Sequence, residues 1–272
     1  MFRESHDIRP GINSCRQSSA SHFPEAAAAA ELKLDYAFNN DLEIALLVGE
    51  PGVGKTTLLR RFSHRLATAG HAVVDVFFPQ LQPDELLAFV DGELGASNNS
   101  AGEDRHNALR RIARRARQLG REQRALVIVI DDAHLITDRD VLETLQSLLN
   151  LRDREAVRLM LLLAGEKSLL ANLARVPALA GRVGVTALLA PLNLQELKSY
   201  LRQQSLGGNK NSSELDDQTL ECLHRMSAGI PRTVNRICEM ARLLARADGR
   251  ETAKLADLES LEGEFAMGSR AA

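Results

Sequence analysis

One nine-residue stretch early in the chain has the residue types needed to bind a phosphate chain. It reads GEPGVGKTT and matches the pattern G-x-x-x-x-G-K-[ST] in full. Such glycines let backbone N–H groups surround a β-phosphate, the lysine reaches the β and γ oxygens, and the next hydroxyl is a Mg²⁺ ligand. The candidate ATP-binding residues are therefore Gly49, Glu50, Pro51, Gly52, Val53, Gly54, Lys55, Thr56 and Thr57. The alternative is a chance glycine-rich turn.

Two adjacent acids end the apolar run LVIVIDD. An acid that follows a buried strand can hold Mg²⁺ or its water shell, and we assign this role to Asp131. Asp132, beside it, is suited to orient or deprotonate the attacking water. The alternative is a solvated strand end whose acids cap the next helix. The phosphate loop upstream favours a Mg²⁺ site, with Thr56 and Asp131 as its ligands.

The segments around these motifs alternate between strand and helix patterns. Five continuous apolar runs of strand length are expected, at residues 44–48, 71–78, 126–130, 157–163 and 183–188. Helical patterns lie between them, and a further helix is expected from Pro24. This alternation predicts an α/β fold with a five-stranded parallel sheet flanked by helices on both faces. The phosphate loop falls between the first strand and a helix, as its motif requires.

The last part of the chain has a different pattern. After Pro191 the strand signals stop and helical periods recur through Phe265, opening with Asn193 and Glu196 as a capping-box-like pair. The stretch LGGNKNSSE is expected to be a turn between helices. We therefore expect a disordered N-terminal tail at 1–22, an α/β core at 23–191, a helical lid at 192–266 and a flexible tail at 267–272.

Composition argues against several classes of protein. The 272 residues include 34 Lys and Arg against 36 Asp and Glu, a net charge of -2, so no overall basic character points to a polyanion. The apolar runs are shorter than the ~20 residues of a membrane helix, and the first residues lack the apolar region of a signal peptide. Three cysteines without a C-x-x-C spacing argue against a disulfide framework or a zinc site. A cytoplasmic location is expected.

Five segments, taken together and in this order, resemble the AAA+ ATPases of the general secretion pathway protein A (ExeA-type) family. They are VGEPGVGKTTLLRRF, LVIVIDDAHLI, LMLLLAGEKSLL, APLNLQELKSYL and SAGIPRTVNRICEMA, and they lie within about residues 23–265. The resemblance implies a P-loop NTPase core of the AAA+ type with strand order 5-1-4-3-2, a C-terminal helical lid, ATP bound between the two, and activity tied to oligomerisation. Lys55, Thr56 and Asp131 match the family's ATP site directly.

Two arginines are candidates for contacts with the γ-phosphate. The motif GIPR supplies Arg232 at the position that the family uses as sensor 2. Pro231 marks a helix start, and a cation in a first turn opposes the helix dipole unless an anion offsets it. An ordinary surface arginine is the alternative. Arg182, just before the last strand, is the candidate for an arginine finger that reaches a neighbouring subunit's nucleotide; an ion pair within its own subunit is the alternative.

Three positions depart from the family pattern. Asp132 stands where Glu is usual, so its carboxylate reaches one methylene less far. Glu166 stands where a neutral Gln or Asn usually senses γ-phosphate, and an acid there repels phosphate unless it is protonated or paired. Thr186 stands where a second arginine is common. Together these departures predict slow hydrolysis that a partner stimulates.

Two further features are weaker candidates for the site. His134, which follows the acids, could contact a metal-bound water, but a single histidine at a helix start is more often solvated or hydrogen-bonded. Tyr36 and Phe38 could pack near adenine, as the corresponding region does in similar ATPases. Simple packing in the core is at least as good an explanation for these two aromatic residues.

The segment from Arg105 to Arg124 is strongly basic, with eight arginines against one acid, Glu122. The arginines that share one stripe of a helix are Arg110, Arg114, Arg117 and Arg121. Such a stripe is a candidate surface for a DNA backbone or for another subunit. No aromatic residues are interleaved, so base stacking is not indicated. A solvated helix face offset by acids elsewhere is the favoured alternative.

The leading hypothesis is an ATP-binding AAA+ ATPase that hydrolyses ATP slowly, forms a homo-oligomer and remodels a protein partner. ExeA-type proteins of secretion commonly carry a membrane span and a wall-binding module after the ATPase part, and this sequence ends just after the expected lid, which weakens a role in secretion. One alternative is an ATP-gated DNA-binding regulator similar to the target-selecting ATPases of Mu-type transposons. Another is a non-hydrolysing ATP switch in an envelope or export complex, based on Asp132, Glu166 and Thr186.

Overall fold

The computed structural model of the chain describes residues 25–77, 79–95, 105–155, 157–206, 216–250 and 253–268. The expected tail at 1–22, Pro24 and most of the turn LGGNKNSSE lie outside the described residues. Of the expected tail at 267–272, the first two residues belong to the last helix and the others lie outside the described residues.

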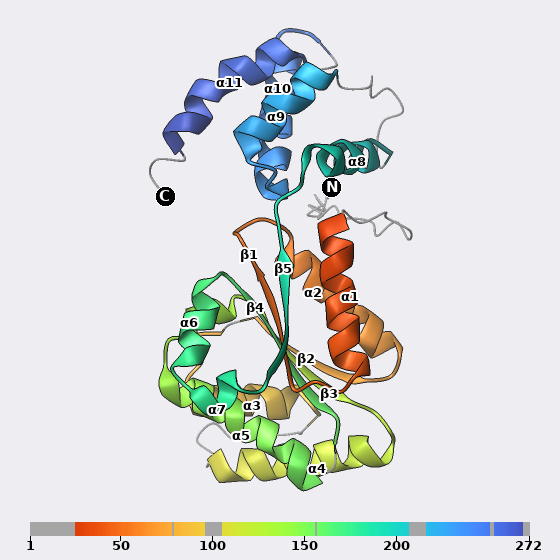
Figure 1. Cartoon of the computed structure of the whole chain (residues 1–272), viewed down its shortest axis with the longest axis vertical. Coiled ribbons are helices and arrows are strands. Elements are labelled where there is room, and N and C mark those ends of the chain that lie inside the picture. Colours follow the sequence, from red (N-terminus) through yellow and green to blue (C-terminus); the bar gives the residue numbers. More distant parts are fainter. Residues whose placement is uncertain are drawn as a thin grey trace, which may run out of the picture.

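A five-stranded parallel sheet forms the centre of the core (Figure 1). Its strands are β1 (Ile44–Gly49), β2 (Ala72–Val76), β3 (Leu126–Ile130), β4 (Leu159–Gly165) and β5 (Val183–Leu189). They lie in the order β2-β3-β4-β1-β5, and all four pairings are parallel. This confirms the predicted strands and the order 5-1-4-3-2. Because the strands are parallel, their carboxyl ends meet at one edge, where Gly49, Asp131 and Glu166 lie at or just after three neighbouring strand ends.

Helices cover both faces of the sheet. One face carries α1 (Glu25–Asn39) and α2 (Lys55–Thr68), and the other carries α3 (Pro83–Glu93), α4 (Arg105–Arg121), α5 (Arg139–Glu155), α6 (Ser168–Ala174) and α7 (Pro177–Ala180). Successive strand residues point to opposite faces, so Leu46 packs in one hydrophobic core and Leu47 in the other. Burial on both faces explains why β1, β3 and β4 read as continuous apolar runs, whereas the edge strands β2 and β5 are only partly buried.

Within the described residues, four helices beyond the carboxyl edge of the sheet form a lid with its own hydrophobic core (Figure 1). They are α8 (Leu194–Leu206), α9 (Asp217–Ser227), α10 (Pro231–Ala247) and α11 (Leu255–Gly268). Leu197, Leu223, Val234 and Ile237 are among the buried residues of this core. The chain enters the lid directly from β5. No helix within the described ranges has the length and apolar character needed to cross a membrane.

A buried acid joins the lid to the core. Asn193 and Glu196 form the predicted capping box at the start of α8: the backbone N–H of Asn193 donates to Oε2 of Glu196 over 2.8 Å, and the N–H of Glu196 donates to Oδ1 of Asn193 over 2.9 Å. The other oxygen of Glu196, Oε1, accepts the backbone N–H of Ala26 over 2.9 Å. Glu196 is only 8% exposed and satisfies the starts of two helices at once.

Candidate nucleotide-binding site

The phosphate loop joins β1 to α2 and has the open backbone of an anion cradle. Gly52 and Gly54 have φ values of +82° and +110°, a region that L side chains rarely adopt. A Cβ added at Gly54 would meet nothing within 4 Å, whereas one at Gly52 would lie 2.9 Å from Cβ of Arg232. The loop is therefore open to a ligand at Gly54 and closely covered by the lid at Gly52.

Lys55 is held under the loop and has hydrogen-bonding capacity to spare. Its side chain is 7% exposed, and Nζ donates to the carbonyl oxygens of Gly49 and Glu50 over 2.9 and 3.0 Å. An ammonium group has three donors, so one remains for a phosphate oxygen. Burial lowers the pKa of Lys55 below its ordinary value, while the charges of Asp132, Glu166 and Asp131 act in the opposite direction.

Thr56 and Asp131 meet where a divalent cation would be bound. Thr56 Oγ1 donates to Oδ2 of Asp131 over 2.6 Å, and Oδ1 of Asp131 accepts the backbone N–H of Asp132 over 2.9 Å. A hydroxyl and a carboxylate are the hard oxygen ligands that Mg²⁺ prefers, and this ion usually completes its shell with water and substrate phosphates. The two predicted metal ligands thus fit Mg²⁺ held together with a nucleotide.

Asp132 has a strained backbone beside this pair. Its φ and ψ are 48° and 32°, the left-handed region, which Asp tolerates better than most residues. Its side chain is 58% exposed. Left-handed residues other than glycine often occur at functional sites, where the surrounding structure holds them in place. The carboxylate is therefore accessible to water at the carboxyl edge of the sheet.

His134 contacts both acids around the site. Its Nε2 lies 3.5 Å from Oε1 of Glu166, and its Nδ1 lies 4.0 Å from Oδ1 of Asp132. The side chain is 15% exposed, and Nδ1 is buried without a hydrogen-bond partner in the described part of the chain. A Cβ at Gly165 would lie 3.0 to 3.2 Å from atoms of His134, so this glycine leaves room for the ring. His134 is thus largely buried and not solvated, and a contact with a metal-bound water stays a prediction.

The residues that place His134 beside Glu166 lie in two separate segments of the sequence. The histidine follows the acids at the end of β3, while Gly165 and Glu166 follow the neighbouring β4. Only the strand order brings these segments together. The backbone carbonyl of His134 also accepts Nδ2 of Asn172 in α6 over 2.8 Å, which fixes the segment further.

Arg232 begins the first turn of α10, next to the phosphate loop. Its backbone N–H donates to the carbonyl of Gly52 over 3.2 Å, and Pro231 precedes it at the helix start, as predicted. The side chain is exposed, and its charge contributes to lowering the pKa of Lys55. Arg232 thus lies beside the cradle, and its contact with a γ-phosphate stays a prediction.

Arg182 lies at the opposite edge of the sheet. Its guanidinium donates to Oε2 of Glu43 over 3.1 Å and to Oδ1 of Asn150 over 2.8 Å. The seven residues of β5 separate it from the phosphate-loop edge, a length of about 23 Å at ~3.3 Å per residue. The ion pair within its own subunit is therefore present, and a role toward a neighbouring subunit stays a prediction. Thr186 lies within β5, where its register partner is Leu46.

Phe38 also lies at this amino-terminal edge and not near the phosphate loop. Its ring centroid is 5.0 Å from that of His71, just before β2, and Cζ of Arg158, just before β4, lies 4.8 Å from the Phe38 ring. The alternative of core packing holds for Phe38, because the ring contacts one of the hydrophobic cores. Tyr36 is largely exposed in the same last turn of α1. Of the two alternatives, the structure favours core packing over a place near adenine for Phe38, and it leaves Tyr36 exposed.

Comparisons with known proteins agree with this geometry. Residues 40–173 match a family described as AAA domain. Over 236 residues the chain is 30% identical to general secretion pathway protein A of Aeromonas hydrophila, which covers 84% of this chain and 42% of that protein. The chain therefore spans less than half the length of this curated relative.

Solved structures of low sequence identity share the fold. They include Cdc6p from Pyrobaculum aerophilum, with a TM-score of 0.71 and 19% identity over 88% of this chain and 66% of that chain. The ORC2 protein of Aeropyrum pernix, solved as ADPNP-ADP complexes, has a TM-score of 0.67 and 19% identity over 91% and 70%. The ORC1 protein of the same organism, solved in complex with DNA, has a TM-score of 0.65 and 18% identity over 89% and 66%. The motifs, the strand order and the sequence match together show that the chain belongs to the AAA+ ATPases of the general secretion pathway protein A (ExeA) type.

Proposed function

We propose that the chain binds Mg²⁺ and ATP at the carboxyl edge of its sheet and hydrolyses ATP slowly. The observation that carries this proposal is the 2.6 Å contact between Thr56 Oγ1 and Asp131 Oδ2, directly beside the ammonium group of Lys55. These groups come from two neighbouring elements, α2 and the end of β3, and they provide a cation site and an anion site at one place. Solved relatives of the same fold contain ADPNP and ADP.

Each residue has a distinct part in the proposed reaction. The loop N–H groups and Lys55 would hold the β and γ phosphates, and Thr56 and Asp131 would hold Mg²⁺, which supplies charge neutralisation when it is bound. Asp132 would accept a hydrogen bond from the attacking water and take its proton. Because this carboxylate is short and exposed, the basal rate is expected to be low until a partner or a neighbouring subunit positions the water.

Glu166 and His134 are proposed to act as a pair near the γ-phosphate. An unpaired carboxylate would repel the nucleotide, but Nε2 of His134, 3.5 Å from Oε1 of Glu166, would give that carboxylate a partner. The pair therefore offers a way to keep an acid at a position that faces phosphate. Arg232, on the lid, would add a positive charge from the other side once the lid closes.

Nucleotide binding is further proposed to drive self-association and remodelling of a protein partner. Support comes from Arg182, which would act on the nucleotide of the next subunit, and from the sequence match to general secretion pathway protein A. For that role the side chain of Arg182 must break its hydrogen bonds to Glu43 and Asn150. Subunit assembly is therefore coupled to the loss of these two contacts. A cytoplasmic location is part of the proposal, because Cys222 and Cys238 are free thiols.

Phosphate release and ATP binding test the proposal together. Lys55→Ala is expected to abolish both, since the buried ammonium group is the main positive charge on the phosphates. Lys198→Ala is the control, because Lys198 lies on α8 of the lid and pairs with Asp217 at the surface. Equal phosphate release by the wild type and Lys55→Ala would remove the claim of ATP hydrolysis.

A non-hydrolysing ATP switch is the second candidate, and the geometry of Asp132 favours it. The short acid, its left-handed backbone and the neighbouring Glu166 all differ from a site built for fast water attack. This candidate predicts ATP binding that Lys55→Ala removes, without phosphate release even when the chain is fully associated. Turnover that rises with protein concentration would exclude it.

A further inference from the structure

Helix α4 presents a row of arginines on the side opposite its buried face. The row, called the α4 arginine row, consists of Arg110, Arg114, Arg117 and Arg121. All four side chains are exposed, while Ala108, Ile112, Ala116 and Leu119 of the same helix are buried. At 100° per residue the two sets lie on opposite sides of the helix. The row therefore points away from the core along its full length.

The α4 arginine row differs from other basic residues of the same segment. Arg111 is paired with Asp91 over 2.5 Å, and Arg124 is paired with Glu122 over 3.0 Å. Within the described residues, no carboxylate pairs with Arg110, Arg114 or Arg121. The alternative of a face offset by acids holds for Arg111 and Arg124, but it does not hold for these three members of the row.

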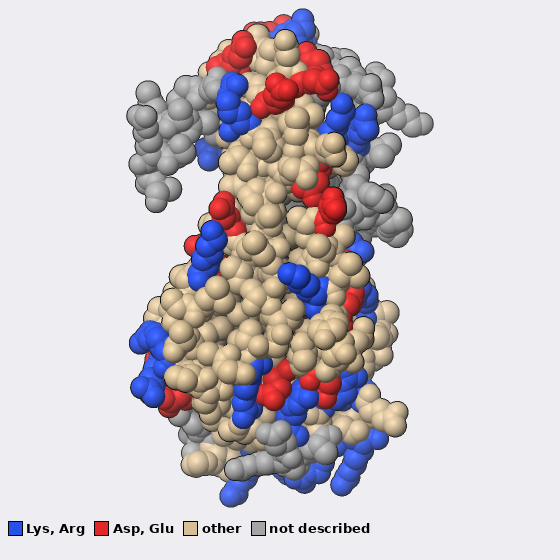
Figure 2. Space-filling model, in the orientation of Figure 1, with Lys and Arg blue, Asp and Glu red and all other residues tan. Residues whose placement is uncertain are grey.

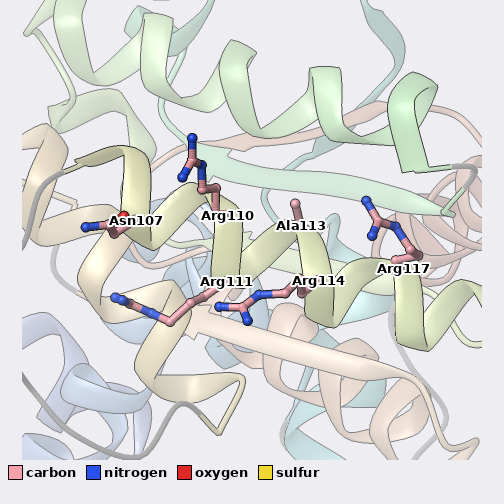
Figure 3. A pocket seen from close by; sticks show the side chains of 6 residues that line it. All are labelled: Asn107, Arg110, Arg111, Ala113, Arg114 and Arg117. Carbon is pink, nitrogen blue, oxygen red and sulfur yellow. The ribbon is translucent and has the colours of Figure 1, made fainter.

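The surface around the row is hollowed and basic. An open depression of about 500 Å³ lies over α4, lined by Asn107, Arg110, Arg111, Ala113, Arg114 and Arg117. Figure 3 shows Arg110 and Arg117 projecting from one side of the helix axis and Arg111 and Arg114 from the other. Figure 2 shows Lys and Arg side chains gathered at the end of the core that α4 forms in Figure 1, away from the lid.

The chemistry of this face fits a phosphate backbone better than a protein. Protein interfaces use large apolar or aromatic anchors at their centre, and none of the exposed large hydrophobic residues of the described structure lies on α4. α4 carries no Phe, Tyr or Trp that could stack on a base. Guanidinium groups bind phosphate oxygens in a bidentate manner. A partner recognised here would be a polyanion bound through its charge.

The spacing of the row also fits a nucleic acid. Arg110 and Arg121 are separated by about 16 Å along the helix, at ~1.5 Å per residue. One strand of a duplex carries a phosphate about every 3.4 Å of its axis, so the row spans about five phosphates of one strand. Over this length the strand turns about half-way round the duplex axis, at about 10 base pairs per turn, so the row can contact the backbone on one side of the duplex only, with four contacts as the maximum.

We infer that the α4 arginine row binds the phosphate backbone of double-stranded DNA without reading its sequence. Because contacts to phosphate carry no sequence information, affinity depends on salt and not on base order. This binding needs neither ATP nor the catalytic groups, so it is separate from the proposed hydrolysis. It also supplies the surface that an ATP-gated DNA-binding regulator requires.

Two double variants give a matched test. Arg110→Gln/Arg114→Gln removes two members of the row, and Arg242→Gln/Arg246→Gln removes two exposed arginines of α10 in the lid with the same spacing. Each double variant removes two positive charges, so the net charge changes equally. Circular dichroism checks that both variants keep their helices.

The measurement is fluorescence anisotropy of a labelled random-sequence duplex between about 50 and 200 mM salt. With four phosphate contacts, the slope of log K against log salt is expected to be about -3.6, a loss of affinity of about 150-fold across this range. The α4 variant is expected to show a slope of about -1.8 and a loss of about 12-fold. The α10 variant should behave like the wild type. A single strand of equal length should show a shallower slope, with about 0.7 per contact instead of 0.9.

Three results would overturn the inference. The first is no binding of the duplex at the lowest salt. That result would indicate that the α4 arginine row binds an acidic protein instead of DNA. The second is equal weakening by the α4 and α10 variants, which would show that only net charge matters. The third is a large difference between two unrelated duplex sequences, because backbone contacts alone predict equal affinities.

Discussion

His134 lies with Nε2 3.5 Å from Oε1 of Glu166, so a histidine after β3 and an acid after β4 form one pair at the proposed γ-phosphate position. The other ring nitrogen, Nδ1 of His134, lies 4.0 Å from Oδ1 of Asp132. The histidine ring therefore lies between the candidate base and the candidate phosphate sensor. The position of these two acids is expected to depend on it.

Replacing Glu166 tests how much a carboxylate next to the γ-phosphate weakens ATP binding. Glu166→Gln removes one negative charge and keeps the size of the side chain, so ATP is expected to bind about fivefold more tightly, or about 1 kcal/mol. Titration with a fluorescent ATP analogue measures this change. Glu143→Gln, on the remote helix α5, is the control and should leave the affinity unchanged. Weaker binding by Glu166→Gln would show that the carboxylate itself holds the nucleotide.

A double-mutant cycle tests whether His134 acts through Glu166. His134→Gln is expected to weaken ATP binding about fivefold in the wild type, because Glu166 loses the group that offsets its charge. In the Glu166→Gln background the same change is expected to have no effect, since no charge is left to offset. A purely structural role for the histidine would give the same loss in both backgrounds.

Asp132→Asn tests the candidate base. Asn tolerates the left-handed backbone of this position as well as Asp does, so the fold and ATP binding should be kept. Loss of a general base is expected to lower the stimulated hydrolysis rate by about 100-fold or more. Phosphate release at saturating ATP is the measurement. An unchanged rate at unchanged affinity would show that another group activates the water.

Gly52→Ala tests the contact between the phosphate loop and the lid. A Cβ at Gly52 would lie 2.9 Å from Cβ of Arg232, so the first turn of α10 must move, and ATP binding is expected to fall at least about tenfold, or about 1.4 kcal/mol. Gly70→Ala is a matched control, because Gly70 also has a positive φ but nothing within 4 Å of the added atom. Both variants should lose about 1–2 kcal/mol of stability through their backbones. Equal ATP affinity in the two would argue against the lid contact.

The lid is expected to lose stability in acid through Asp257. Hydrogen bonds from Arg250 and from the backbone of Lys254 lower the pKa of Asp257 from 3.8 to about 2. A lowered folded-state pKa stabilises the protein above the unfolded value, and this contribution is lost as the pH falls from about 4 to about 2. Asp257→Asn should lower the melting temperature at pH 7 and reduce its pH dependence in that window. An unchanged profile would show that Arg250 gives Asp257 no net stabilisation.

The strands and the cation site could be predicted from local sequence. A strand buried on both faces needs a continuous apolar run, and a phosphate cradle needs glycines and a lysine at fixed spacing, so both leave a signal within a few residues. Thr56 and Asp131 could be brought together because parallel strands end at one edge. The strand order itself followed from the family resemblance and not from periodicity.

Contacts that depend on packing across elements could not be predicted in this way. The pair of His134 and Glu166 depends on the room that Gly165 leaves for the ring, which a single sequence does not record. For Phe38 a place near adenine, as in similar ATPases, and simple core packing were both open, and the length of α1 carries this residue to the edge of the sheet opposite the phosphate loop. Position along a rigid helix, and not residue type, decides which end of the core a side chain reaches.

Glu196 connects the lid to the core, so movement of the lid must break one of its hydrogen bonds. One of its oxygens closes the capping box of α8 and the other holds the amide of Ala26 in the first turn of α1. A lid that swings away must therefore leave this amide without its acceptor and expose the carboxylate of Glu196, a residue that is 8% exposed in this structure. The capping box of α8 lies wholly within the lid and is kept at every lid angle, so opening breaks only the hydrogen bond to the Ala26 amide. Exchange of the Ala26 amide with solvent deuterium then becomes a direct reporter of lid opening, read out at a residue that never touches the nucleotide.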